Sequence, residues 1–237
     1  MAFVELSVVI PVFNERDNLE LLVGEINEAL ATHLTYEIIL VDDASTDDSS
    51  NILDLLEKQQ RNLRVIRHVN NRGQSAAVIT GVRAAQYPWV ATLDGDRQND
   101  PRDLIMMIGL IKQEESVGLV MGRRTKREDN YLRKLSTKIA NSVRRFFLQD
   151  DCYDSGCGIK IFSRELFLQL PLFKNCHRFL PALFNRAGAR VVYVPVHHRP
   201  RVAGVSKYGV WNRLWVGIVD LMGIAWLLRR LLRPEGQ

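Results

Sequence analysis

Apolar and polar residues follow a repeating pattern along the first half of the chain. Short apolar runs, each ended by a polar or glycine-containing loop, alternate with longer stretches in which apolar residues recur every three or four positions. The short runs predict strands, the first of them stopped by Pro11, at Leu6–Ile10, Glu37–Val41, Leu63–Arg67, Trp89–Leu93 and Leu119–Met121.

The longer stretches have the spacing of helices that bury one face. Ser45 is placed to cap the second of them, with Asp47 and Asp48 in its first turn. Strands that recur about every 25 to 30 residues with helices between them predict right-handed βαβ units and a mostly parallel sheet. The predicted helices contain Leu19 to Leu30, run from about Thr46 to Lys58, cover Gly73 to Gln86, and carry Leu104, Ile105, Ile108 and Ile111 after Pro101.

The second half has fewer clear elements. The segment Asp154–Phe162 is rich in glycine and then resembles a strand, and Val191–Val196 predicts another strand that leads into a basic loop. The segment Leu214–Leu228 is apolar except for Asp220 and predicts a helix. We therefore expect one α/β domain over residues 1–209, with helices on both faces of its sheet, and an amphipathic helix within residues 210–237.

The C-terminal helix has two open interpretations. A 15-residue helix would be about 22 Å long, which is shorter than the roughly 30 Å hydrocarbon core of a bilayer. Its tryptophans and the arginines that follow suit a helix lying in the interface of an anionic membrane. A core or oligomer contact explains its apolar face equally well. The residues concerned are Trp211, Trp215, Trp226, Arg229, Arg230 and Arg233.

An acidic loop, Asp94-Gly95-Asp96, directly follows the fourth predicted strand. Two neighbouring carboxylates repel each other and are costly to bury. A hard divalent cation removes both penalties and leaves positions for phosphate oxygens, and Gly95 would let a ligand approach the backbone. The alternative is an Asp-Gly turn that only ends a strand.

Three polar loops follow strands of the predicted parallel sheet, at Phe13–Asn18, Asp42–Thr46 and Asp94–Asp100. Ligands of such sheets bind outside the carboxyl ends of the strands, so we expect these loops to converge on one site. The glycine patterns of dinucleotide-binding folds and of P-loops are absent from the sequence. Phosphate would then be held by a cation and by basic side chains.

Composition narrows the class of partner. The 237 residues are 46% hydrophobic and 25% charged, with a net charge of +5 and a pI of about 9.2, which favours an anionic partner. Nucleic acid is the weakest candidate, because aromatic residues are not interleaved with the basic runs. The odd number of cysteines, Cys152, Cys157 and Cys176, indicates a reducing compartment, and we expect no signal peptide.

These motifs, taken in order, resemble family 2 glycosyltransferases of the GT-A fold, and among them the dolichyl- and polyprenyl-phosphate sugar synthases. The resemblance spans about Leu6 to Tyr208. It is carried by Val9-Ile10-Pro11-Val12-Phe13-Asn14-Glu15, Val41-Asp42-Asp43-Ala44-Ser45, Asn70 to Gly73, Asp94-Gly95-Asp96-Arg97-Gln98, Gly122-Arg123-Arg124, and Arg201 to Tyr208.

The resemblance implies roles for the matching positions. Nucleotide base and ribose would be bound by Pro11, Phe13, Glu15, Val41 and Asp43. The D-x-D motif falls on Asp94, Gly95 and Asp96, with Gln98 also near a Mg²⁺ or Mn²⁺ ion. Donor or acceptor phosphates would be contacted by Arg123, Arg201 and Lys207, and a lipid phosphate by Arg133 and Ser136. Asp154, Cys157 and Gly158 match a segment near the acceptor.

The implied reaction is an inverting transfer of a hexose, most simply mannose from GDP-mannose, to a polyprenyl phosphate. An anionic acceptor needs no strong general base, whereas a sugar hydroxyl would require one such as Asp100 or Asp154. The loop reads Arg97-Gln98-Asn99 where relatives often have Leu-Gln-His, which leaves the donor open between GDP-mannose and a UDP-hexose. A UDP-sugar transferase acting on a hydroxyl and a catalytically silent membrane-associated subunit are the alternatives.

The resemblance also implies where in the cell the protein acts. Many bacterial relatives carry transmembrane hairpins after the catalytic domain, whereas this sequence ends in one amphipathic helix. We expect a cytoplasmic protein that meets its lipid peripherally at the inner membrane face or through a membrane-protein partner.

Overall fold

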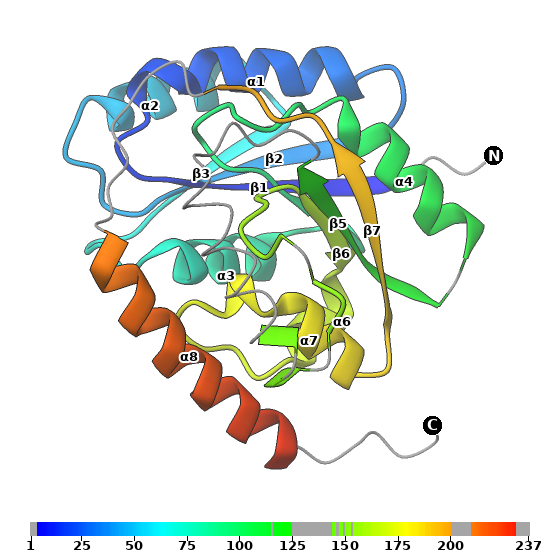
Figure 1. Ribbon diagram of the computed structural model, residues 1–237. Helices are drawn as coiled ribbons and strands as arrows, with labels where there is room; N and C mark the ends of the chain where they lie inside the picture. Colours follow the sequence, from blue (N-terminus) through cyan, green and yellow to red (C-terminus); the bar gives the residue numbers. More distant parts are fainter. Residues whose placement is uncertain are drawn as a thin grey trace.

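The computed structural model describes residues 4–114, 116–124, 144–145, 147–148, 150–152, 154–200 and 210–230, with side chains in the last segment described at 217 and 219–230. Within these residues seven strands form one sheet in the order β3-β2-β1-β4-β6-β5-β7 (Figure 1). β6 is antiparallel to β4 and β5, and the other neighbours are parallel. The strands are β1 (Glu5–Val12), β2 (Thr35–Asp42), β3 (Leu63–Arg67), β4 (Trp89–Thr92), β5 (Val117–Arg124), β6 (Lys160–Ser163) and β7 (Arg190–Val196).

Helices cover both faces of the sheet because successive residues of a buried strand point to opposite sides. Val8 and Ile10 of β1 join the core under α1, α2 and α4, whereas Val9 joins the core under α3, α6, α7 and α8 (Figure 1). The helices are α1 (Arg16–Leu30), α2 (Ser49–Gln59), α3 (Gln74–Ala84), α4 (Asp103–Gln113), α6 (Arg164–Gln169), α7 (Leu180–Arg186) and α8 (Val210–Arg230), with a short 3₁₀ helix, η1 (Cys176–Arg178).

The predicted α/β architecture is confirmed, but Pro11 does not end the first strand. β1 continues through Pro11 to Val12, where Pro11 lies opposite Val41 of β2. On its other side β1 pairs with β4 only as far as Val9. Pro11 therefore lies beyond the last β4 partner, where a missing N–H costs no sheet hydrogen bond on that side.

The prediction that Ser45 caps the second helix is wrong. α2 begins at Ser49, and the Ser45 hydroxyl instead accepts a hydrogen bond from the main-chain N–H of Asn14 at 3.0 Å. Asp47 precedes the helix and accepts from the N–H of Ser49 at 2.9 Å. The serine therefore joins two loops at the sheet edge, and the helix starts three residues later than the predicted boundary.

Three further differences lie in the second half. β5 extends to Arg124, so Arg123 belongs to the strand that was expected to end at Met121. α6, η1 and α7 were not predicted, because the region after Ser163 lacks a long periodic apolar pattern. α8 is longer than expected at 21 residues.

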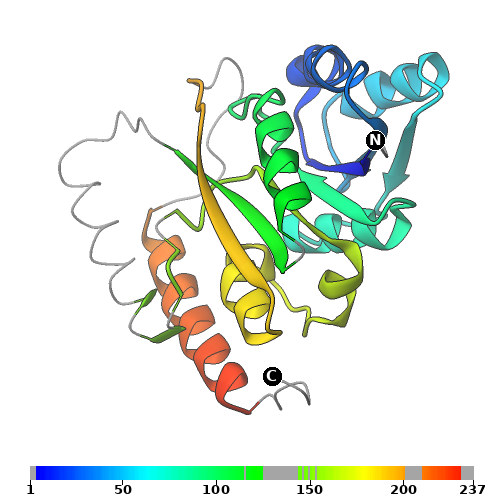
Figure 2. The same cartoon turned by 90° about the vertical axis from the view of Figure 1, so that its right-hand side faces the viewer.

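One face of α8 packs against the domain. Figure 2 shows α8 running beside the rest of the domain. Ile224 and Ala225 are buried in the core that α3 and α7 share, and Arg186 of α7 donates to the main-chain oxygen of Leu228 at 3.1 Å. Asp220 accepts from Asn175 at 2.8 Å. Of the helices within the described residues, none has both the length and the apolar composition required to cross a bilayer.

Candidate active site

The loops after β1, β2 and β4 meet at one edge of the sheet, as predicted from their parallel strands. The loop after β1 is joined to the loop after β2 through Asn14 and through Glu15, whose N–H donates to the Ser49 hydroxyl at 3.1 Å. Asn14 and Ala44 both have left-handed backbones, with φ of 54° and 60°. Such conformations are unfavourable for side chains other than glycine and concentrate at functional sites.

The Asp42-Asp43 pair anchors the neighbouring loops. The buried Asp43 carboxylate accepts the N–H groups of Arg72 and Gly73, at 2.9 and 2.7 Å, and contacts His68 at 2.6 Å. Asp42 accepts from the N–H of Ser45 at 2.9 Å. Both carboxylates are thus satisfied by the chain itself, and Asp43 sets the position of the loop that precedes α3.

The other residues predicted to bind the nucleotide lie around this edge with different exposure. Pro11, Phe13 and Glu15 are partly exposed, and Glu15 accepts from the Asn18 amide at 2.8 Å. The Val41 side chain is fully buried against α3, so only its main chain remains for a ligand.

Gly95 was expected to leave room for a ligand beside the backbone, but it lies against the loop after β1. A side chain on Gly95 would come within 3.3 Å of Glu15 Cγ and 3.4 Å of the Pro11 carbonyl. The missing side chain therefore allows the D-x-D loop to pack against the loop after β1, rather than leaving space for a ligand.

Asp94, the first carboxylate of the D-x-D motif, lies between α3 and the segment before β6. Its Oδ1 accepts from Gln74 of α3 at 2.9 Å. Its Oδ2 lies against Gly158, where an added Cβ would be only 2.1 Å away. Burial, and then repulsion from Asp96, raise the pKa of Asp94 to about 6.

Asn99 is a site residue that the sequence reasoning did not single out. It is buried, and within the described part of the chain its Oδ1 has no hydrogen-bond partner. The same Cβ position on Gly158 lies 2.1 Å from Asp94 Oδ2 and 2.8 Å from Asn99 Oδ1, so these oxygens are at most about 4.9 Å apart. These two acceptor oxygens lie close together, and a cation or a hydroxyl group would satisfy both.

Asp96 and Gln98 complete the acidic loop. Asp96 is 8% exposed and accepts from the N–H of Gln98 at 3.2 Å. The amide nitrogen of Gln98 donates to the carbonyl of Arg199 at 3.3 Å, so its oxygen is the end left for a ligand. A set of carboxylate and carboxamide oxygens fits Mg²⁺ or Mn²⁺ and does not fit a softer metal. In the described ranges, no group of three or more aspartate, glutamate, histidine or cysteine side chains is arranged so that it could hold a metal ion.

A network of ion pairs holds this loop in place. Glu25 of α1 binds both Arg97 and Arg199, and Arg199 also binds Asp100 at 2.8 Å. Burial by itself raises the pKa of Asp100, but hydrogen bonds from Arg102 and Arg199 outweigh it and keep the pKa well below its usual range. The D-x-D loop is thereby joined to α1 and to the segment after β7.

The two arginines at the end of β5 behave differently. Arg123 is exposed at the strand end and remains available to a phosphate. Arg124 makes a two-pronged pair with the buried Asp154, at 2.7 and 2.6 Å. Asp154, considered above as a base, is therefore neutralised by Arg124.

Several predicted site residues cannot be placed. Arg133, Ser136, Arg201 and Lys207 lie outside the described residues, so their roles stay predictions. Cys157 is a buried free thiol. Burial raises its pKa to about 11, so it is no nucleophile at neutral pH.

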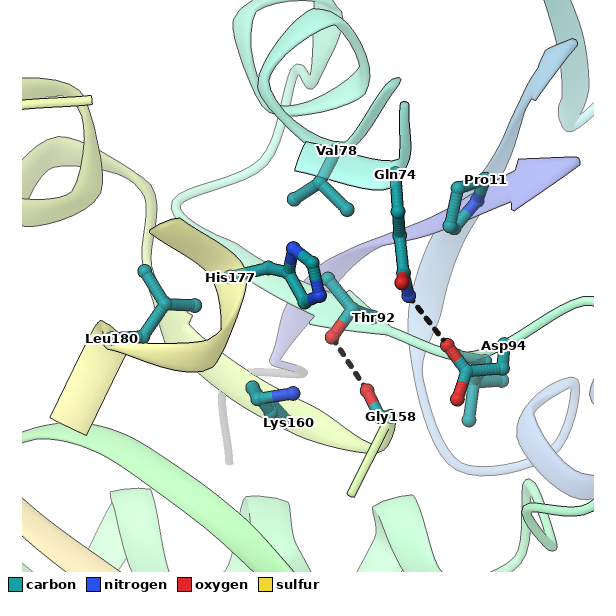
Figure 3. A pocket seen from close by; sticks show the side chains of 10 residues that line it. Pro11, Gln74, Val78, Thr92, Asp94, Gly158, Lys160, His177 and Leu180 are labelled. Atoms are coloured by element: carbon teal, nitrogen blue, oxygen red, sulfur yellow. Dashed lines mark hydrogen bonds between the residues drawn. The ribbon is translucent and has the colours of Figure 1, made fainter. Parts of the chain in front are cut away.

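A pocket adjoins Asp94 on the side of α3 and η1 (Figure 3). Gln74 and Val78 of α3 line it, and Lys160 and His177 point into it from β6 and η1. Neither Lys160 nor His177 was predicted as a site residue. Both lie far from Asp94 in the sequence, and the antiparallel insertion of β6 beside β4 brings the lysine close.

Comparison with known families explains the arrangement of motifs. Residues 7–170 match the model of "Glycosyl transferase family 2". The chain belongs to this family. It is 34% identical over 234 residues to dodecaprenyl-phosphate galacturonate synthase of Rhizobium johnstonii, covering 97% of this chain and 69% of the relative. It is 33% identical over 209 residues to undecaprenyl-phosphate 4-deoxy-4-formamido-L-arabinose transferase of Klebsiella pneumoniae, covering 86% of this chain and 62% of that relative.

Solved structures confirm the predicted GT-A fold for this family 2 glycosyltransferase. Glucosyl-3-phosphoglycerate synthase from Mycobacterium tuberculosis, in complex with Mn²⁺, UDP and glucosyl-3-phosphoglycerate, has a TM-score of 0.70 at 22% identity, over 98% of this chain and 81% of that one. A Pyrobaculum calidifontis mannosyltransferase with GDP-Man and Mn²⁺ has a TM-score of 0.69 at 20% identity, over 97% and 65%.

Proposed function

We propose that this glycosyltransferase transfers a sugar from a nucleotide sugar to a polyprenyl phosphate, with inversion at the anomeric carbon. The two curated relatives named above carry polyprenyl-phosphate acceptors in their names. The chain spans about two thirds of each relative's length, so the acceptor is our inference and not a property carried over with the family.

The observation that supports a phosphate acceptor is the state of the two carboxylates that could act as a base. A hydroxyl acceptor must lose a proton to a group whose pKa lies near the working pH. Asp100 is bound by Arg102 and Arg199, and Asp154 is bound by Arg124. A carboxylate neutralised by guanidinium groups is a weak base, whereas a phosphate monoester is already an anionic nucleophile.

We assign the cation to Asp94, Asp96 and Gln98, with Asn99 beside them. When bound, Mg²⁺ or Mn²⁺ would stabilise the negative charge that develops on the leaving diphosphate. Arg123 is exposed at the same sheet edge and would bind a donor or acceptor phosphate, a role we also assign to Arg201 and Lys207. These cations would bring two anionic substrates together.

For the donor, mannose from GDP-mannose stays a prediction. The relatives are named for galacturonate and for a formamido-arabinose, and the structural neighbours contain UDP or GDP-Man. The base site would be formed by Pro11, Phe13 and Glu15, with Asp43 fixing the adjacent loop. The sugar is therefore the part of the proposal that most needs measurement.

The deciding experiment is transfer of radiolabel to a short polyprenyl phosphate in the presence of Mn²⁺. Labelled GDP-mannose, UDP-glucose, UDP-N-acetylglucosamine and UDP-galacturonate are compared as donors. We expect label in the lipid phase that is stable to alkali and labile to acid. Donor hydrolysis without label in the lipid phase would contradict a lipid acceptor. It would favour the alternative reaction, in which the acceptor is a sugar hydroxyl.

We further propose that α8 places the enzyme on the cytoplasmic face of an anionic membrane. Val219, Met222 and Trp226 are 64%, 66% and 63% exposed, and they follow one another at helical spacing on the face opposite Ile224. Arg229 and Arg230 are exposed beyond them. An apolar stripe next to cations is the pattern of a helix that lies in a lipid interface.

Liposome sedimentation tests this placement. Replacing Met222 and Trp226 with serine should reduce binding to vesicles that contain phosphatidylglycerol, while nucleotide binding is retained. The control replaces the exposed Leu55 and Met106, which lie on α2 and α4. If both variants bind the vesicles equally well, the exposed apolar residues of α8 would be better explained as a contact with another protein.

A further inference from the structure

Lys160 is a buried cation that makes no direct ion pair within the described residues, although Asp94 in the same pocket is close enough to attract it electrostatically. Its side chain lies in the pocket beside Asp94 and is 4% exposed. The ammonium group donates to the carbonyl of Cys157. No carboxylate oxygen of the described residues lies within 4.0 Å of the Lys160 ammonium nitrogen, the distance that defines an ion pair. Burying an unpaired ammonium is costly, and that cost is removed when a ligand brings an anion.

His177 adds a neutral donor to the same wall. The Ser75 hydroxyl accepts from the His177 main-chain N–H at 3.2 Å and lies 2.7 Å from the ring nitrogen Nδ1. The hydroxyl therefore donates to Nδ1, which leaves the ring proton on Nε2. Burial, together with Lys160 and Arg178, lowers the pKa of His177 to about 3, so the ring stays neutral.

The pocket opens beside the D-x-D loop, which indicates what it would hold. Figure 3 shows Lys160 and His177 on one side, and Asp94 with its partner Gln74 on the other. A group that reaches Lys160 while its diphosphate is held at Asp96 is the sugar of the donor. Val78 and Leu180 add apolar surface to the same pocket.

We propose that this pocket selects a donor whose sugar carries a carboxylate, a uronic acid, and that Lys160 is the counter-ion of that carboxylate. The proposal rests on the proposed function for the presence of a nucleotide-sugar donor. A primary hydroxyl at the same position would bring no charge to the ammonium, whose hydrogen-bond partner, the Cys157 carbonyl, is neutral. A carboxylate can accept hydrogen bonds from both Lys160 and the Nε2–H of His177. The pocket would therefore distinguish a donor sugar with a carboxylate from one with a primary hydroxyl, and would not distinguish one sugar ring from another.

The test compares two donors that differ only at the sugar's sixth carbon. Calorimetry with UDP and GDP in Mn²⁺ first identifies the base that binds. The matched pair is then UDP-galacturonate with UDP-galactose, or GDP-mannuronate with GDP-mannose. We expect the uronate to bind at least tenfold more tightly than the neutral sugar. Lys160→Met should abolish that preference and leave binding of the nucleoside diphosphate unchanged.

Two further variants keep the result interpretable. Lys112→Met removes an exposed lysine of α4 and should retain the preference. Lys160→Arg keeps the charge and should retain part of it, which separates loss of charge from loss of fold. Equal binding of acid and neutral donors by the unmodified enzyme would overturn the proposal. So would an equal loss of nucleoside diphosphate binding in Lys160→Met, because the lysine would then serve the diphosphate.

Transfer to polyprenyl phosphate separates this proposal from the proposed function. Lipid label from the neutral donor without label from the uronate would reject the carboxylate pocket and keep the lipid acceptor. A preference for the uronate that depends on Lys160, without any lipid label, would keep the pocket and reject the acceptor.

Discussion

Two acidic loops end neighbouring regions of the same sheet edge, and they use their carboxylates in opposite ways. In the loop after β2, Asp43 accepts three contacts from its own chain, two of them from the main chain that precedes α3. In the loop after β4, Asp94 Oδ2 and Asn99 Oδ1 lie within about 4.9 Å of each other, and the Asn99 oxygen has no hydrogen-bond partner among the described residues. The first loop is an internal anchor, and the second has acceptors left for a ligand. Adjacent acidic residues in a sequence do not distinguish these cases.

The largest effect is expected for Asp96→Asn. If the second loop is a cation receptor, loss of this charge should reduce metal-dependent sugar transfer by roughly 1,000-fold, the scale of removing one preorganised electrostatic group. Circular dichroism and thermal unfolding should remain unchanged. The exposed Asp17 offers a control, Asp17→Asn. Full turnover of Asp96→Asn in Mn²⁺ would remove Asp96 from the cation site.

Gly158→Ala should follow in size. Its Cβ would come 2.1 Å from Asp94 Oδ2 and 2.8 Å from Asn99 Oδ1, so the acceptor pair must move. A displacement on that scale costs about 100-fold in turnover. Gly109→Ala is the matched control, because a Cβ on Gly109 of α4 meets nothing within 4 Å. Similar activities for the two alanine variants would show that the Asp94 position is not needed.

The two loops should respond oppositely in stability when each aspartate becomes asparagine. Asp43→Asn weakens hydrogen bonds to a buried charged acceptor and should cost roughly 2–3 kcal/mol in urea unfolding. Asp94→Asn removes a carboxylate that is penalised by burial and then by repulsion from Asp96, so it should stabilise the metal-free protein at pH 7 by about 1–3 kcal/mol. Equal destabilisation by both changes would end the distinction between the loops.

The pH dependence sharpens this contrast. Folding raises the pKa of Asp94 from 3.8 to about 6, so the folded chain binds more protons than the unfolded chain between those values. Stability of the chelator-treated protein therefore falls as pH rises through that window. In Asp94→Asn that component is absent, and its advantage over the parent should vanish below about pH 4.

Asn99→Ala should have the smallest effect. Loss of one neutral oxygen beside Asp94 should weaken Mn²⁺ binding about tenfold. This is the lower end of the loss in metal affinity that follows when a residue supporting the metal ligands is removed. Electron paramagnetic resonance of free Mn²⁺ measures this without reference to turnover. Asn51→Ala, on the exposed face of α2, is the control. An unchanged Mn²⁺ affinity would indicate that the Asn99 oxygen serves a hydroxyl of the donor.

The sequence predicted the first half of the molecule well. Alternating apolar runs and helical spacing are local signals, and they indicated β1 to β4, α1, α3 and α4 with the acidic loops at one edge. The start of α2 was missed because Ser45, a good capping residue, is instead bonded to Asn14 from another loop. The hydrogen bond to Asn14 depends on the tertiary fold, so the residues around Ser45 in the sequence give no sign of it.

The site was predicted only where chemistry and strand end coincide. Asp94 and Asp96 follow a buried strand and were singled out on that ground, and Gln98 through the family resemblance, and their roles stay predictions. Asn99 and Lys160 were not singled out. Lys160 resembles an ordinary strand lysine until β6 is placed antiparallel between β4 and β5. The opposite roles of Asp43 and Asp94 depend on partners about 30 and 20 residues away, at Gly73 and Gln74.

The insertion of β6 also sets an order of events during synthesis. Thr92 pairs with Lys160, so one wall of the pocket beside Asp94 is supplied by chain made 68 residues later. At about 5–20 residues per second, roughly 3 to 14 seconds pass between the emergence of the two strands. During that interval the edge of β4 has no partner on that side and is open to wrong pairing. The pocket beside Asp94 is thus completed late. If it is the donor site that we propose, a ribosome-bound chain that ends before Ser163 should bind neither cation nor donor as the complete protein does.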